Sequence, residues 1–177
     1  MFIRKSMEAL GRRPQEEVKE SPAHNILIIM DDVRSMHNVG SAFRTADAFG
    51  LAGIYLCGFT PTPPHRDIRK TALGAEDSVS WKHFKTVEEA LSDARELGYE
   101  LVAVEQAEGS KSLQNFTING EQKLAFVFGN EVSGVSDAAL SRVGICLEIP
   151  QWGAKHSLNI SVSIGVVLWE IVRMNGS

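Results

Sequence analysis

The chain has 177 residues, of which 44% are hydrophobic and 23% are charged, and its formal net charge is −4. This length suits one domain with a sizeable core, and the composition is ordinary for a soluble globular protein. A negative net charge argues weakly against nucleic-acid binding, because phosphate contacts need Lys and Arg. Charge can be concentrated locally, however, so its distribution along the chain decides.

No targeting or membrane segment is expected. The first twenty residues lack the apolar core of a signal peptide. The longest apolar-rich run, 158–172, holds four polar residues and is too short to span a bilayer. Cys57 and Cys146 lie in apolar runs without C-x-x-C spacing, which indicates buried thiols in a reducing compartment. We therefore expect a cytoplasmic protein.

In chain order, a short basic leader comes first, and the proline-bounded stretch 14–22 separates it from the rest. Apolar, β-branched runs then predict buried strands over 25–30, 53–58, 100–105, 124–129 and 145–150. Helical periodicity and end signals predict helices over 38–49, 65–73, 86–99, 136–143 and from 157 onward. Wholly apolar strands that alternate with helices predict an α/β fold, a parallel sheet flanked by helices.

The helix expected from Ser157 onward is apolar almost all round. Such a helix is buried on most sides, so other parts of the chain or a second subunit should cover it. Ser157 is its expected N-cap. Asn159 is then an amide inside an apolar helix, and a buried amide needs hydrogen-bond partners.

The common nucleotide and metal motifs are absent. Val135 stands where a P-loop needs Lys, and residues 38–44 lack the G-x-G-x-x-G fingerprint. There is no H-E-x-x-H or G-x-S-x-G, and the five histidines are scattered, so no metal site is expected. Three polar, glycine-bearing loops remain, 31–44, 129–134 and 149–159. Each follows a strand, and ligands of such sheets bind at the strands' carboxyl ends, so we predict a common site there.

The first of these loops runs into a helix with residues that local rules explain only in part. Asn38 suits an N-cap of the helix 38–49. Gly40 in a first helical turn costs about 1 kcal/mol relative to Ala, which makes sense if a ligand or backbone approaches closely. Arg44 lies beside the apolar stripe, where it could be a solvated partner of Asp47.

Four segments resemble the SpoU/TrmH family of RNA ribose 2′-O-methyltransferases. They are N-x-G-x-x-x-R over 38–44, K-T-A-L-G-A-E-D over 70–77, F-G-N-E over 128–131 and I-P…S-L-N-I-S-V over 149–162. The resemblance covers about residues 25–173. It implies the SPOUT fold with a C-terminal deep trefoil knot, a homodimer and S-adenosylmethionine as methyl donor. Sequence physics alone would exclude a knot.

The resemblance divides the chain and assigns roles. We expect residues 1–22 to form the basic N-terminal leader and residues 23–177 to form the SPOUT methyltransferase domain. The implied catalytic residues are Arg44, Asn38, Glu131, Ser157 and Asn159. The implied cofactor-binding residues, acting through their backbone, are Gly129, Ile149 and Leu158. From the residues alone, Glu131 could equally be a solvated loop acid.

Arg44 matches the family's catalytic arginine. A guanidinium is effectively always protonated, so it is a poor base. We therefore expect Arg44 to grip the neighbouring RNA phosphate and stabilise the developing alkoxide, while the proton passes to the phosphate or to water.

Basic residues gather in two places, although such runs are often merely solvated. Arg4, Lys5, Arg12, Arg13 and Lys19 lie in the leader, and His65, Arg66, Arg69 and Lys70 follow a proline-rich loop. We expect them to contact RNA phosphates, with binding that weakens as salt rises.

The sequence thus predicts S-adenosylmethionine-dependent methylation of a ribose 2′-hydroxyl in RNA by a homodimer that needs no metal and no membrane. A short leader without a large RNA-binding module favours tRNA over rRNA as the substrate. The alternatives are a ribosomal RNA 2′-O-methyltransferase and a catalytically silent RNA-binding or assembly module on the same fold.

Overall fold

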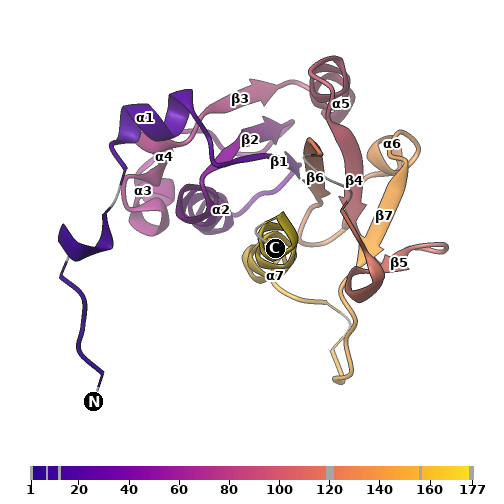
Figure 1. Ribbon diagram of the computed structural model, residues 1–177. Helices are drawn as coiled ribbons and strands as arrows, with labels where there is room; N and C mark the ends of the chain where they lie inside the picture. The colour runs from indigo at the N-terminus through magenta and orange to yellow at the C-terminus, as the bar shows by residue number, and fades with distance from the viewer. Residues whose placement is uncertain (1, 7, 12, 119–121, 156, 176–177) are drawn as a thin grey trace.

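The computed structural model describes residues 2–6, 8–11, 13–118, 122–155 and 157–175 (Figure 1). It contains a seven-stranded sheet in the order β3-β2-β1-β6-β4-β7-β5, and every pairing is parallel. The strands are β1 (His24–Asp31), β2 (Leu51–Cys57), β3 (Trp81–Phe84), β4 (Glu100–Val104), β5 (Lys111–Ser112), β6 (Leu124–Phe128) and β7 (Ile145–Glu148). The predicted α/β fold with a parallel sheet is confirmed.

Helices cover both faces of this sheet. The α-helices are α1 (Gln15–Glu20), α2 (Met36–Phe49), α3 (Arg66–Ala72), α4 (Ala75–Ser78), α5 (Val87–Glu96), α6 (Asp137–Leu140) and α7 (Ile160–Asn175), of which α1 packs against α4. Successive side chains of a strand point to opposite faces. Ile26, Ile28 and Met30 of β1 accordingly pack in the core under α2, α3 and α7, whereas Leu27 and Ile29 pack in the core under α5 and α6 (Figure 1).

Strand β6 lies between β1 and β4 at the centre of the sheet. Met30 of β1 and Val104 of β4 both pair with Phe128, the last residue of β6. The carboxyl ends of the three strands therefore lie side by side, although β1 is about seventy residues away from β4 in the chain. This arrangement brings distant loops to one edge of the sheet.

Helix α2 begins at Met36, two residues before the predicted start. Its N-cap is Ser35, whose hydroxyl accepts a hydrogen bond of 3.2 Å from the backbone N–H of Asn38. The prediction that Asn38 is the cap is wrong, because the serine three residues earlier satisfies that N–H. Gly50, with φ of 61°, ends the helix as predicted.

Gly40 lets α2 approach α3 closely. A Cβ at this position would lie 2.1 Å from Thr71 Oγ1 and 2.3 Å from the carbonyl oxygen of Ile68. Neither distance is possible for a real side chain, so the residue must be glycine for the helices to pack in this way. Of the two predicted explanations, the close approach of backbone is the one that the structure supports.

Helix α7 begins at Ile160, not at Ser157. Asn159 caps it, because its Oδ1 accepts hydrogen bonds of 2.9 Å from the backbone N–H of Ser161 and 2.6 Å from the Ser161 hydroxyl. The prediction that Ser157 is the cap is therefore wrong. Asn159 is also exposed rather than an amide buried inside the helix.

One face of α7 packs on the sheet, and the opposite face is open. Ile164, Val167, Leu168 and Ile171 are fully buried in the core shared with α2. On the open face three apolar side chains are 49%, 40% and 59% exposed, namely Val162, Val166 and Trp169. The chain thus does not wrap α7 on all sides, which leaves a second subunit as the remaining predicted cover.

Candidate functional site

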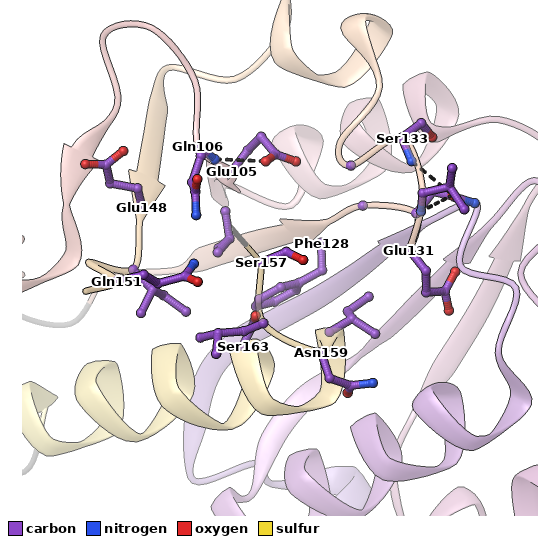
Figure 2. A pocket seen from close by; sticks show the side chains of 18 residues that line it. Glu105, Gln106, Phe128, Glu131, Ser133, Glu148, Gln151, Ser157, Asn159 and Ser163 are labelled. Carbon is purple, nitrogen blue, oxygen red and sulfur yellow. Dashed lines mark hydrogen bonds between the residues drawn. The ribbon is translucent and has the colours of Figure 1, made fainter. Parts of the chain in front are cut away.

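A cavity of about 540 Å³ lies where β4, β6 and β7 end and α7 begins (Figure 2). We call it the strand-end pocket. It is lined by residues 104–106, 128–134, 148–149, 151, 157–160 and 163. Its walls come from three strand ends and from the segment before α7, which matches the rule that parallel sheets bind ligands at the carboxyl ends of their strands.

The pocket brings together most of the predicted site. Six predicted residues line it, namely Gly129, Glu131, Ile149, Ser157, Leu158 and Asn159. Asn38 lies outside the lining but is joined to it, because its Nδ2 donates a hydrogen bond of 3.0 Å to Glu131 Oε1. Arg44 is not among the lining residues.

Glu131 fastens the 129–134 loop to the start of α2. Besides Asn38, its carboxylate accepts hydrogen bonds of 3.1 Å and 3.0 Å from the backbone N–H groups of Arg34 and Ser35. Partial burial acts to raise the pKa of Glu131, but the hydrogen bonds outweigh burial and lower the pKa below its ordinary value of 4.5. Glu131 is therefore an ionised acceptor that positions the loop, not a free loop acid.

Hydrogen bonds also fix the turn that forms one wall of the pocket. Asn130 Nδ2 donates to the carbonyl oxygen of Asp32 at 2.6 Å, and Asn130 forms a backbone bridge with Gly134. Gly134 has φ of +70°, and a Cβ there would lie 2.2 Å from Glu105 Oε2. That oxygen accepts a hydrogen bond of 2.9 Å from the backbone N–H of Val135. The turn is thus tied to the ends of both β1 and β4.

Two pocket carboxylates are absent from the sequence prediction. Glu105 follows the last residue of β4, and Glu148 is the last residue of β7 (Figure 2). The Ser110 hydroxyl donates a hydrogen bond of 2.7 Å to Glu148. Their place at strand ends is the signal that could have found them. Carboxylates here can accept hydrogen bonds from ligand hydroxyl or ammonium groups. The cofactor contacts that the resemblance implies for the backbone of Gly129, Ile149 and Leu158 stay a prediction.

Arg44 lies on the exposed side of α2. Among the described residues, no hydrogen bond or ion pair involves its guanidinium. The predicted pairing with Asp47 does not form, since Asp47 instead accepts a hydrogen bond of 2.6 Å from the Ser78 hydroxyl. The guanidinium is therefore available to a partner outside this chain.

The basic leader is only partly available for contacts. Arg4 and Lys5 are exposed. Arg13 is engaged, because its guanidinium contacts Glu17 Oε1 at 2.8 Å and the carbonyl oxygen of Ser21 at 2.7 Å. Arg12 lies outside the described residues. The RNA contacts predicted for these residues stay a prediction.

The second basic group lines another cavity, of about 780 Å³, on the leader side of the molecule. Lys70 forms an ion pair of 2.6 Å with Asp67. Arg69 lies 3.7 Å from Glu76 and 4.0 Å from Asp77. Arg66 is exposed and has no ion pair with any described residue. Acidic neighbours thus offset part of the positive charge of this group.

The described part of the chain has neither a candidate membrane span nor a candidate metal site. No helix there is long and apolar enough to cross a membrane. Nor do three or more His, Cys, Asp or Glu side chains gather there as metal ligands would. Both cysteines are free thiols, Cys57 buried and Cys146 only half-buried.

Known proteins resemble this chain in sequence and in fold. The model of the family described as SpoU rRNA methylase matches residues 25–169, which is most of the chain. The chain belongs to the SpoU methylase family. The match includes every residue of the strand-end pocket as well as Asn38 and Arg44.

Relatives in the SpoU methylase family carry names of RNA-modifying enzymes. The chain is 29% identical over 150 residues to a 23S rRNA (guanosine-2′-O-)-methyltransferase RlmB of Nitrosomonas europaea, covering 85% of this chain and 56% of that one. It is 26% identical to a tRNA (guanosine(18)-2′-O)-methyltransferase of Borreliella burgdorferi, covering 89% and 70%. The chain thus spans little more than half the length of the first of these relatives.

Solved structures of the SpoU methylase family have the same fold. An AdoMet-bound rRNA methyltransferase from Sinorhizobium meliloti aligns with a TM-score of 0.79 and 27% identity, covering 91% of this chain and 60% of that one. The A. aeolicus TrmH/SpoU tRNA modifying enzyme aligns with the same TM-score and 24% identity, covering 92% and 81%. The trefoil knot stays a prediction.

Proposed function

We propose that this SpoU methylase family member transfers a methyl group from S-adenosylmethionine to a ribose 2′-hydroxyl of RNA. The observation that carries the proposal is the strand-end pocket, which gathers Gly129, Ile149 and Leu158 with Glu131 and Asn159. The names of the relatives support the same reaction.

The strand-end pocket has the size and chemistry for this cofactor. Its volume of about 540 Å³ lies in the range of small-molecule sites, roughly 300–1,000 Å³. Apolar side chains such as Phe128 and Leu158 suit an adenine ring, and Glu105 and Glu148 suit ribose hydroxyls and an ammonium group. When bound, S-adenosylmethionine supplies a methyl group that its sulfonium already activates.

The protein's own part is alignment and charge. Glu131 holds residues 34–38, the start of the helix that carries Arg44. Arg44 then grips an RNA phosphate and stabilises the alkoxide that develops as the 2′-hydroxyl loses its proton to the phosphate or to water. Correct alignment of the oxygen with the methyl group supplies much of the acceleration.

Our proposal includes a homodimer that packs through α7. Val162, Val166 and Trp169 are exposed about one turn apart on the face of α7 opposite to the buried one, and apolar side chains grouped in this way are suited to a protein–protein interface. Arg44 lies outside the strand-end pocket of its own chain, so a partner chain can bring it to the cofactor. Sedimentation tests this: Val166→Glu should shift a dimer toward the monomer, and a monomeric parent chain contradicts the proposal.

For the substrate we propose tRNA or ribosomal RNA, since relatives named for each match this chain. Sequencing that maps 2′-O-methyl sites in total RNA, from cells with and without the gene, tests the reaction and identifies the nucleotide. Calorimetry with S-adenosylmethionine measures cofactor binding in parallel. If the well-folded chain binds no S-adenosylmethionine, and deletion of its gene removes no 2′-O-methyl site, the protein is instead a silent RNA-binding module.

A further inference from the structure

The cavity of about 780 Å³ on the leader side is lined by Lys19, residues 63–66, 69–70 and 76–77, and Trp81. We call it the leader cleft. Its walls come from α1 in the leader, from the proline-rich loop, from α3 and α4, and from the first residue of β3, which lie together at the β3 edge of the sheet (Figure 1). No part of the strand-end pocket contributes to it.

The leader cleft carries a net positive charge. Four cationic side chains and two acidic ones line it. Glu76 is buried, where it accepts a hydrogen bond of 3.0 Å from the backbone N–H of Gly74 and lies beside Arg69. Lys19 and Arg66 are exposed and have no ion pair with any described residue. These two charges are therefore the ones free to meet an anion.

The same cleft contains an aromatic ring. Trp81 is half-buried: it packs against the core on one side and lines the cleft on the other. Pro63 and Pro64 add further apolar surface. Stacking of bases on aromatic rings beside a basic groove is how many proteins hold single-stranded nucleic acid. A simple anion would need the charges but not the ring.

We propose that the leader cleft holds an unpaired nucleotide of the RNA substrate, with the base on Trp81 and the flanking phosphates near Lys19 and Arg66. The proposal rests on the proposed function, which makes RNA the substrate. A base inside a duplex is stacked and cannot enter a cavity, so the cleft selects a loop or a single-stranded segment. The sequence prediction of basic contacts becomes a defined site, in which Lys19 and Arg66 replace Arg69 and Lys70 as the main phosphate contacts.

Binding of a short, fluorescein-labelled, single-stranded RNA, followed by anisotropy, tests the cleft. Lys19→Gln and Arg66→Gln should each weaken binding and reduce its slope of log affinity against log salt by about 0.7. Trp81→Leu should weaken binding at least about fivefold, whereas Trp81→Phe should retain most of it. Lys111→Gln is the matched control, because this exposed lysine lies on β5 at the opposite edge of the sheet.

Photo-cross-linking of the parent chain tests the cleft without any substitution, so a misfolded variant cannot affect the result. RNA that contains 5-bromouridine is bound to the protein and irradiated with ultraviolet light. It should form a covalent cross-link to the peptide that contains Trp81. Attachment only at Trp152 or Trp169, the exposed tryptophans outside the cleft, overturns the proposal. Cleft variants that bind RNA like Lys111→Gln overturn it as well.

Failure of the cleft and failure of the proposed function give different results. If the parent methylates RNA but the cleft variants bind RNA normally, only the cleft is wrong. If RNA binds through the cleft but no cofactor binds and no methyl group is transferred, only the proposed function is wrong.

Discussion

The strand-end pocket and the leader cleft differ in the sign of their charge and in the hydrogen-bonding groups that they present. The pocket contains Glu105, Glu131 and Glu148, and backbone N–H groups or a serine hydroxyl already donate to each of them. The cleft presents free cations, Lys19 and Arg66, beside a tryptophan. A pocket of fixed acceptors suits a small molecule with hydroxyl and ammonium groups, and a basic cleft with a ring suits a polyanion.

Net charge is therefore a weak guide to the partner of this protein. The formal charge of −4 is a sum over surfaces of opposite character. Because long-range steering depends on the local field, a basic cleft can attract RNA to an acidic protein.

The largest expected effect comes from a residue that belongs to neither region. Arg44→Ala should lower the rate of methyl transfer about 100- to 1,000-fold, because it removes the charge that stabilises the alkoxide. Cofactor affinity, measured by calorimetry, should not change. Arg44→Lys should recover little, since it keeps a point charge but loses the forked grip. Full activity in Arg44→Lys would contradict the forked contact, and loss of cofactor binding would assign Arg44 to the pocket.

Salt should separate the two regions directly. Raising salt from about 50 mM to about 200 mM should weaken RNA binding about tenfold, if two or three phosphates are contacted. Cofactor affinity should change less than about twofold, because the pocket binds through short hydrogen bonds. Anisotropy with labelled RNA and calorimetry with S-adenosylmethionine measure the two. Equal salt dependence for RNA and for S-adenosylmethionine would contradict the inferred difference in charge between the cleft and the pocket.

Gly134→Ala should damage the pocket and spare the cleft. The left-handed backbone at φ of +70° and the clash with Glu105 should cost about 1–2 kcal/mol in the free energy of unfolding. Cofactor affinity should fall severalfold, while binding of single-stranded RNA stays the same. Gly144→Ala is the matched control, since a Cβ there meets nothing within 4 Å. Equal effects of the two substitutions would show that the pocket does not depend on the conformation of the turn at Gly134.

The smallest effect concerns the pH dependence of stability. Folding lowers the pKa of Glu131 below its ordinary value of 4.5, so its stabilising contribution is present above that pH and is lost as pH falls through the folded pKa. Glu131→Gln should cost about 1 kcal/mol in urea unfolding at pH 7, and less as the solution is acidified. A difference between parent and variant that stays constant with pH would mean that the carboxylate charge plays no part.

The sequence predicted the central strands well because their patterns are strong. The runs 25–30 and 124–129 are apolar throughout, and both are buried strands. The two outer strands were missed for the opposite reason. Strand β3 has exposed Lys82 and His83 at its centre, and β5 is only two residues long. An edge strand needs little burial, so its sequence carries little signal.

The site was predicted as a group of loops but not in its details. The strand-end rule brought Gly129, Ile149 and Asn159 together correctly. Caps could not be assigned with the same accuracy, because several Ser and Asn residues near each helix start are equally suitable. Glu105 was missed because the predicted strand 100–105 includes it, whereas β4 ends at Val104 and Glu105 is the first residue beyond the strand.

Glu131 lines the pocket and also accepts from the first turn of α2. The chain therefore has a mechanical link between the place where a small molecule binds and the helix that presents Arg44. A ligand that competes for this carboxylate must release the base of α2, and one that leaves it undisturbed keeps the helix anchored. By thermodynamic reciprocity, RNA that pulls on α2 must in turn change the affinity of the pocket. Glu131 thus couples the proposed cofactor site to the helix proposed to contact RNA.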